Sequence, residues 1–263
     1  MELFLYILGF SLLGGVVSFA AALLLVRNRA KQPHHTAHLI NFAAGALIAA
    51  AFLDLLPESI EVIGEAHDAT IWAMIGFIIF FLIEGLFHWY HPTHQEERTS
   101  DCSDGGHHQL THTPWLLITA DTIHNFVDGV AIAAAFLINI PLGIVTTFAI
   151  AAHEIPQEVG DVSVMLHAGW KKSRVIFWNL VSAFAATAGA VATYLVRDYI
   201  DIHLGTLLAL TAGFFIYIGA SDLVPELYRT TKRDRLSHAV IMFFVGIIVV
   251  GILAELAHSL GEH

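Results

Sequence analysis

Two polar runs interrupt apolar stretches near the middle of this chain. The first, from His124 to Gly129, reads H-N-F-V-D-G, and the second, from His153 to Glu158, reads H-E-I-P-Q-E. Imidazoles and carboxylates are costly to place inside a bilayer, so within an apolar stretch they indicate an ion or substrate pathway. Imidazole nitrogen and carboxylate oxygen are also ligands that suit zinc and its first-row neighbours. The two runs therefore predict metal handling within a membrane.

The composition is typical of an integral membrane protein. Of the 263 residues, 56% are hydrophobic and 13% are charged, whereas roughly a quarter of the residues in soluble domains are charged. Eight apolar stretches reach the length of about 17–25 residues that a helix needs to cross a bilayer. We therefore predict an all-α integral membrane protein with eight transmembrane helices in one domain, residues 1–263. The expected spans are residues 4–26, 38–58, 71–90, 115–137, 142–168, 175–196, 203–228 and 238–258.

The basic residues predict the orientation of these helices. Of the 12 Lys and Arg residues, all but Arg197 follow odd-numbered spans. Because such residues collect on the cytoplasmic side, we expect both termini to be extracellular or periplasmic in a multi-pass protein of the plasma (inner) membrane. The chain begins Met1-Glu2 without a basic segment, which favours a retained first helix over a signal peptide. The acidic residues are dispersed, so the net charge of −11 predicts no nucleic-acid partner.

The second and seventh spans carry similar sequences. Gly45 precedes D-L-L-P-E at residues 54–58, and Gly213 precedes D-L-V-P-E at residues 222–226 with the same spacing. In the predicted topology the two spans cross in opposite directions, as in an inverted repeat of helices 1–3 and 6–8 around helices 4 and 5. The alternative is that D-L-x-P-E simply ends a membrane helix at water. In the repeat interpretation, acidic residues line the outer and inner mouths of a pathway: Asp54 and Glu58 outside, Asp222 and Glu226 inside.

A polar loop at residues 91–114 joins the third and fourth spans on the predicted cytoplasmic side. It contains five histidines, and His-rich segments can bind metal weakly. A linker whose histidines have no role fits the same sequence equally well. The histidines are His91, His94, His107, His108 and His112.

The fourth and fifth helices bring potential ligands to one depth. His124 lies about nine residues into its span, which at about 1.5 Å per residue is near the middle of a hydrocarbon core of roughly 30 Å, and His153 lies at a similar depth. Residues four apart share a helix face, so Asp128 accompanies His124 and Gln157 accompanies His153. A single membrane histidine is more often a packing residue than a ligand. Two histidines at matching depth, with carboxylates beside them, instead favour metal binding. One ion would then be bound by the side chains of His124, Asp128, His153 and Gln157.

Further polar residues adjoin this predicted site. Asn125 and Glu154 occupy the neighbouring helix faces, where a second ion would lie. Asp121 lies one turn from the first histidine toward the cytoplasm, and Glu158 and Asp161 follow along the fifth helix. We expect these three acidic residues to line a pathway from the site.

The paired motifs resemble those of a known family. H-N-F-x-D-G followed by H-E-I-P-Q-E-V-G-D looks like the ZIP (Zrt/Irt-like) metal transporters. The match from His153 to Asp161, with Trp178-Asn179-Leu180 after it, is similar to the LIV-1-type branch without its large extracellular domain. The resemblance covers essentially all eight helices.

The resemblance implies a zinc-preferring divalent cation transporter that forms a homodimer. Zn²⁺ would be the transported substrate, with Fe²⁺, Mn²⁺ and Cd²⁺ as further candidates, and no organic cofactor is expected. The site would be binuclear, and helices 1, 4, 5 and 6 would move like an elevator against helices 2, 3, 7 and 8. Many relatives have His or Glu where this chain has Gln157, and a neutral amide cannot bridge two cations as a carboxylate can. Carried over by position, the first ion would bind His124, Asp128, His153 and Gln157, and the second Asn125 and Glu154.

Two other classes of protein share part of this pattern. His153-Glu154 with Gln157 differs by one residue from the H-E-x-x-H motif of zinc hydrolases, in which two histidines hold zinc and the Glu acts as base. The missing histidine and Pro156 within the helix count against this enzyme. A structural or receptor-like bundle would not explain ligands at a common depth. No G-x-x-x-x-G-K-[ST] motif is present, so we expect ion flow that is downhill or coupled to another gradient.

Overall fold

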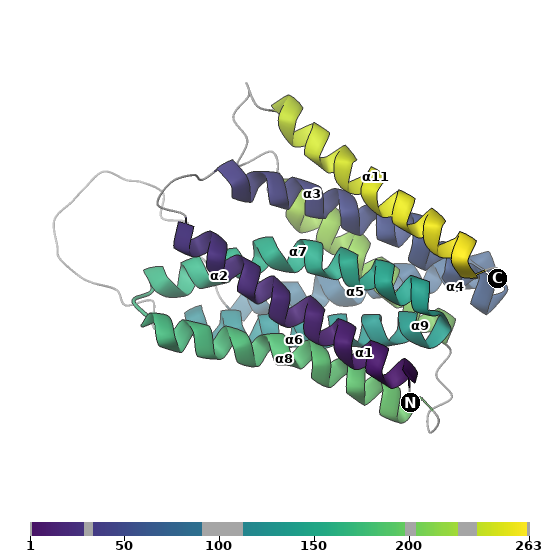
Figure 1. Ribbon diagram of the computed structural model, residues 1–263, viewed down its shortest axis with the longest axis horizontal. Coiled ribbons are helices and arrows are strands. Elements are labelled where there is room, and N and C mark those ends of the chain that lie inside the picture. The colour runs from purple at the N-terminus through teal and green to yellow at the C-terminus, as the bar shows by residue number, and fades with distance from the viewer. Residues whose placement is uncertain (1, 29–33, 91–112, 198–203, 226–235, 262–263) are drawn as a thin grey trace.

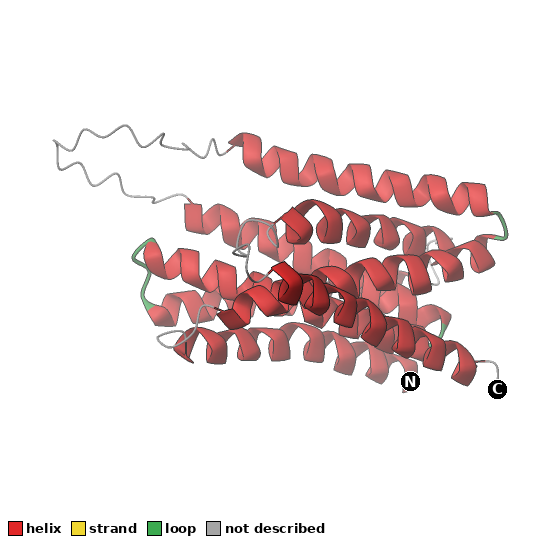
Figure 2. Ribbon diagram, turned by 90° about the horizontal axis from the view of Figure 1, so that it is seen from above, coloured by secondary structure: helices red, strands yellow, loops and turns green. Residues whose placement is uncertain are grey.

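The computed structural model describes residues 2–28, 34–90, 113–197, 204–225 and 236–261. Within these ranges the chain is helical without strands, and the long helices lie roughly side by side (Figures 1 and 2). Each of the eight predicted spans is found as one helix or as helical segments in series. In chain order the segments are α1 (Glu2–Leu12), the π-helical η1 (Leu13–Val17), α2 (Ser18–Asn28), α3 (His34–Ala50), the π-helical η2 (Ala51–Leu55), α4 (Leu56–Ile63), α5 (Ala66–Tyr90), α6 (Thr113–Ile138), α7 (Ile140–His167), α8 (Lys172–Val196), α9 (Leu204–Tyr217), the π-helical η3 (Ile218–Leu223) and α11 (Leu236–Gly261).

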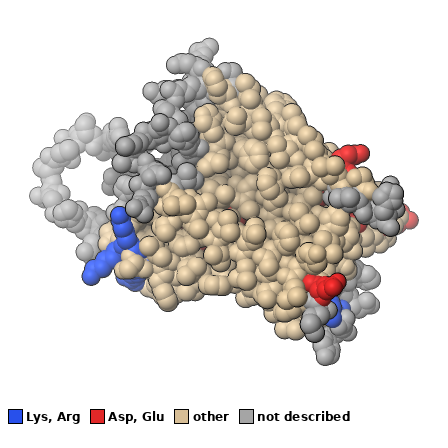
Figure 3. All heavy atoms as spheres, in the orientation of Figure 1, with Lys and Arg blue, Asp and Glu red and all other residues tan. Residues whose placement is uncertain are grey.

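The helices have the length and surface of a membrane bundle. Seven of the eight spans are long and apolar enough to cross a membrane. The fifth span, α7, is not among them, because the polar run from His153 to Asp161 lies along it. Figure 3 shows a broad uncharged surface between Lys and Arg side chains at one end and Asp and Glu side chains at the other, where a basic side chain is also visible. The exposed Lys171, Lys172 and Arg174 follow α7, and this charge distribution supports a bilayer around the middle of the bundle.

The second and seventh spans run side by side in opposite directions. A Cβ atom added to Gly219 would lie 2.8 Å from Cγ1 of Ile48, and one added to Gly205 would lie 2.8 Å from Cγ1 of Ile63. Residue numbers therefore rise along α3 and α4 as they fall along η3 and α9. This antiparallel pairing is the relation expected of an inverted repeat.

Glycines bring α3 and α11 into backbone contact. A Cβ atom added to Gly45 of α3 would overlap the carbonyl oxygen of Phe243, and one added to Gly246 of α11 would overlap that of Phe42. Small residues permit such close approach between membrane helices. The contact is reciprocal, because each helix presents a glycine to a carbonyl of the other.

The same arrangement recurs between α9 and α5. A Cβ atom added to Gly213 would overlap the carbonyl oxygen of Ala73, and one added to Gly76 would overlap that of Leu210. Gly213 corresponds to Gly45 in the sequence repeat. In both helix pairs, each glycine faces the carbonyl of the residue that lies three positions before the glycine of the partner helix. The same reciprocal contact also joins α6 and α8 at Gly129 and Gly189, so this packing is not confined to the repeat.

The helices form two groups. In the first, α6 packs most extensively against α8, with α1, α2 and α7 around this pair. In the second, α3 packs against α11 and α5 against α9. Between the groups, α7 contacts α3 and α11, so it lies near the centre of the bundle (Figure 1).

We expect Gly213→Ala to lower the stability of the bundle. The added methyl group would overlap the Ala73 carbonyl and lie 2.7 Å from the Phe77 nitrogen, and backbone atoms cannot turn aside as a side chain can. Gly85→Ala in α5 is the matched control, because open space surrounds Gly85 and Ala is favoured over Gly in a helix by about 1 kcal/mol. Thermal unfolding in detergent should show a lower midpoint for Gly213→Ala alone. Equal midpoints would contradict the close approach.

Candidate metal site

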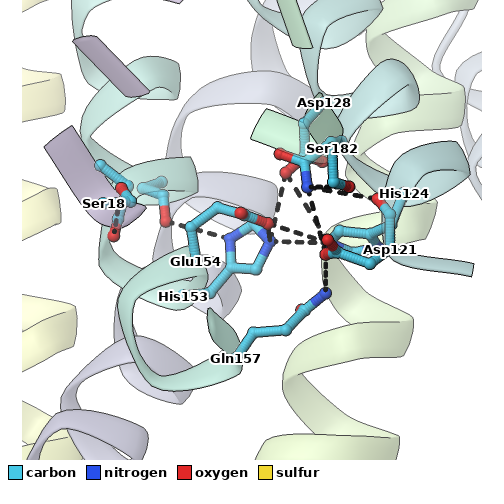
Figure 4. A network of polar contacts seen from close by, with 11 residues as sticks. Ser18, Asp121, His124, Asp128, His153, Glu154, Gln157 and Ser182 are labelled. Atoms are coloured by element: carbon cyan, nitrogen blue, oxygen red, sulfur yellow. Dashed lines mark hydrogen bonds and ion pairs between the residues drawn. The ribbon is translucent and has the colours of Figure 1, made fainter. Parts of the chain in front are cut away.

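Two histidine rings and two carboxylates meet at the centre of the bundle. His124 lies near the middle of α6 and His153 near the middle of α7, and their Nε2 atoms are 3.0 Å apart. Oδ2 of Asp128 is 3.3 Å from Nε2 of His153 and 3.7 Å from that of His124. Oε1 of Glu154 is 3.5 Å from Nε2 of His124 and 3.6 Å from that of His153. All four side chains are buried, and Figure 4 shows them converging from the two helices.

The spacing of these four atoms fits a single tetrahedral ion. Zinc binds four ligands at about 2.0–2.2 Å, which places two ligand atoms about 3.3–3.6 Å apart. The five separations given above lie between 3.0 and 3.7 Å. Oδ2 of Asp128 and Oε1 of Glu154 are buried and accept no hydrogen bond. Lone pairs on two carboxylates and two imidazoles are therefore available to one cation.

The two amides predicted as ligands turn their nitrogens toward Asp121. Nδ2 of Asn125 donates to Oδ1 of Asp121 at 3.1 Å, and Nε2 of Gln157 donates to the same oxygen at 3.4 Å. Nδ2 of Asn125 also lies 3.5 Å from Oγ of Ser182 in α8. In this conformation both amides orient a carboxylate. Their direct binding of metal stays a prediction.

The acidic residues predicted to line a pathway, Asp121, Glu158 and Asp161, are near the histidine cluster or further along α7. One carboxylate oxygen from each of Asp121, Glu154 and Glu158 lies within 4.8 Å of the others. Asp161 is buried further along α7. Glu154 therefore belongs to two groups of potential ligands, one with the histidines and one with carboxylates only.

Aromatic rings from the other helix group border the site. Phe80 of α5 meets the His124 ring edge-on at a centroid distance of 5.5 Å, and Phe215 of α9 lies 6.2 Å from the His153 ring. Sequence reasoning did not identify Phe80, Phe215 or Ser182. Phenylalanine and serine are too common in membrane helices for their types to mark a site.

The predicted mouth residues are only partly described. Asp54 is buried in η2, and Oε1 of Glu58 accepts a hydrogen bond from Nδ2 of Asn139 at 3.3 Å. Asn139 forms the turn between α6 and α7, so Glu58 lies at that end of the bundle. Asp222 lies in η3. Its side chain, Glu226 and the loop at residues 91–112 lie outside the described residues.

The fold and the buried side chains define an integral membrane protein with a candidate metal site, and comparisons with known proteins identify its family. The family described as ZIP Zinc transporter matches residues 2–113 and 90–254. The chain therefore belongs to the ZIP zinc transporter family.

Named relatives agree with this assignment. Zinc transporter ZIP10 of Danio rerio is 39% identical over 147 residues, which cover 54% of this chain and 17% of that protein. Zinc transporter ZIP4 of Mus musculus is 28% identical over 257 residues, covering 72% of this chain and 38% of that protein. Zinc transporter ZIP13 of Pongo abelii is 28% identical over 231 residues, covering 82% of this chain and 66% of that protein. The chain thus spans less than two thirds of the length of most of these relatives and just under two thirds of the last.

We expect Gln157→Glu to lower the thermal stability of the metal-free protein and to increase its stabilisation by zinc. The variant replaces a donor to Asp121 with a like charge, and it offers a charged ligand to the ion. Each tenfold gain in zinc affinity adds about 1.4 kcal/mol of stabilisation at saturating zinc.

Gln157→Leu is the matched control for this experiment. It removes the donor without adding a ligand, so its zinc-induced shift should not exceed that of the wild type. The measurement is the unfolding midpoint of each protein with and without added zinc. If Gln157→Glu shows the wild-type zinc shift, position 157 does not reach the ion.

Proposed function

We propose that this chain carries divalent metal cations, preferentially zinc, across the membrane toward the cytoplasm. The observation that carries the proposal is the set of four buried ligand atoms from His124, Asp128, His153 and Glu154. Two imidazoles and two carboxylates suit zinc, and iron, manganese and cadmium bind the same ligand types. The two carboxylates also balance the charge of one divalent ion within an apolar bundle.

The surroundings of the site support a transported ion over a permanently bound one. The ligands lie at the middle of α6 and α7, where a substrate site of a transporter is expected. Acidic residues continue from it along α7 at Glu158 and Asp161, and Asp54 and Glu58 lie nearer the turn between α6 and α7. Such intramembrane carboxylates are typical of ion pathways.

The packing of the helices supports an elevator-like mechanism. All four ligands belong to the helix group of α1, α2, α6, α7 and α8, which contains helices 1, 4, 5 and 6. Phe80 and Phe215 belong to the opposite group, and their rings lie against the two histidines. Movement of the first group past these rings would carry the ion together with its ligands, so that access alternates between the two sides.

The orientation and the assembly of the protein are proposed from its charges and its family resemblance. The cluster of exposed basic residues after α7 favours a cytoplasmic location for that end, which places both termini outside and the His-rich loop inside. A plasma (inner) membrane location and a homodimer are proposed from the family resemblance. A second ion beside the first, as in a binuclear site, is proposed on the same ground.

The names of the relatives support zinc as the substrate. ZIP10, ZIP4 and ZIP13 are each named zinc transporters and not enzymes. Family membership therefore favours transport over the hydrolase suggested by His153-Glu154.

The test is zinc uptake by sealed vesicles that contain only this protein. His124→Ala and His153→Ala should each reduce saturable uptake to the level of empty vesicles, because each removes one of four ligands. His67→Ala is the control, since His67 is exposed at the start of α5 and should leave uptake at the wild-type rate. Uptake near the wild-type rate by either ligand variant, at equal amounts of reconstituted protein, would refute the assignment.

A further inference from the structure

We propose that the end of the bundle where α7 passes into α8 binds the headgroup of an anionic phospholipid. The headgroup phosphate would meet Lys171, Lys172 and Arg174, and the acyl chains would lie along apolar side chains of α8. This inference goes beyond metal transport, and the binding that it describes does not depend on the metal site.

The first observation is a concentration of positive charge without acidic partners. Lys171, Lys172 and Arg174 are all exposed at the start of α8, at the end of the bundle where Figure 3 shows Lys and Arg side chains together. Among the described residues, no acidic side chain forms an ion pair with any of the three. Three neighbouring cations of this kind attract an anion from outside the chain.

The second observation is that tryptophan rings hold Arg174. Its guanidinium carbon lies 3.9 Å from the centre of the Trp170 ring and 5.1 Å from that of Trp115. The Trp115 ring in turn meets the rings of Trp170 and Trp178 edge-on, at centroid distances of 5.3 Å and 4.9 Å. A guanidinium stacked on a ring keeps its N–H donors at its edge, where they can bind a phosphate with two hydrogen bonds. The stack therefore positions Arg174 for an anion and leaves its charge unpaired.

The tryptophan cluster also indicates the depth of this surface in the membrane. Trp115 lies at the start of α6, Trp170 in the turn after α7 and Trp178 in α8, so three segments place an indole at the same end of the bundle. Tryptophan collects at the level of the lipid headgroups. In the orientation proposed above this end faces the cytoplasmic leaflet, whose surface is negatively charged. The basic side chains would then lie within reach of anionic headgroups.

The third observation is that exposed apolar side chains follow the basic ones along α8. Ile176 is 36% exposed and Phe177 is 58% exposed. Ile176 comes four residues after Lys172, and Phe177 comes three residues after Arg174, and side chains at these spacings are neighbours on a helix. A free anion would use the cations alone, whereas a phospholipid would use the cations and the apolar side chains together. The surface therefore fits an amphiphile.

The test is titration of the purified full-length protein in mild detergent with brominated phosphatidylglycerol or brominated phosphatidylcholine. Bromine quenches the fluorescence of indoles that it contacts, and three of the five tryptophans of the chain belong to this cluster. The wild type should bind the phosphatidylglycerol more tightly than the phosphatidylcholine. Arg174→Gln should weaken binding of phosphatidylglycerol about fivefold, and Lys171→Gln combined with Lys172→Gln about 25-fold, since each basic residue near an anionic surface contributes about a factor of five.

Arg197→Gln is the matched control. Arg197 lies at the other end of α8, where its guanidinium carbon is 3.8 Å from the centre of the Tyr194 ring. It is therefore also an arginine stacked on an aromatic ring, but no lysine or second arginine adjoins it in the sequence. This variant should bind phosphatidylglycerol with the wild-type affinity. If Arg174→Gln is not monodisperse, the double lysine variant provides the test, because both lysines are exposed.

Four outcomes would overturn the inference. The first is equal affinity of the wild type for the two lipids, and the second is wild-type affinity for phosphatidylglycerol in the double lysine variant. The third is an equal loss in Arg197→Gln and Arg174→Gln. The fourth is displacement of phosphatidylglycerol by inorganic phosphate at constant ionic strength, which would identify a site for the free anion. None of these measurements involves zinc, so they are independent of the outcome of the uptake experiment.

Discussion

Carboxylates buried among apolar helices need a cation or a proton to offset their charge, and this requirement governs the centre of the bundle. Asp128 and Glu154 direct buried oxygens toward two imidazole nitrogens and accept no hydrogen bonds there. Asp121, by contrast, receives two amide donors. The buried carboxylates are thus of two kinds. Asp121 receives hydrogen bonds from the protein, whereas Asp128 and Glu154 keep oxygens available to an ion.

The meeting of the ligands depends on one tight turn. α6 ends at Ile138 and α7 begins at Ile140, and Asn139 between them caps α7 by accepting a hydrogen bond from the Leu142 nitrogen at 2.7 Å. Because antiparallel helices rise equally on both sides of a turn, residues equally distant from it lie at one level. His124 and His153 are almost equally distant from Asn139, so the length of the turn determines that their rings meet.

Much of this arrangement follows from sequence, because it depends on length, periodicity and residue type. The eight spans, the repeat of Gly45 and Gly213, and the convergence of His124 with His153 were predicted on those grounds. Periodicity assigns a side chain to a helix face, but it does not say which end of an amide faces a neighbour. For that reason the donation of Asn125 and Gln157 to Asp121 could be found only in three dimensions.

Other features depend on contacts between distant parts of the chain. The rings of Phe80 and Phe215 reach the histidines from helices that no local pattern connects with them. The π-helical segments η2 and η3 lie just before Pro57 and Pro225, at corresponding places in the repeat. Proline removes a backbone donor, but propensity alone would not have distinguished a π-helical turn from a kink.

The backbone contacts at the paired glycines also have a consequence for the proposed movement of the two helix groups. Between α3 and α11, and between α5 and α9, ridges of backbone interlock, so sliding one helix along its partner would force main-chain atoms through each other. Among the glycines in the described ranges, none makes such a contact between α7 and α3 or α11. That boundary is lined by side chains, so the elevator-like movement proposed above would take place there without forcing main-chain atoms through each other. The boundary lies directly beside the helix that carries His153.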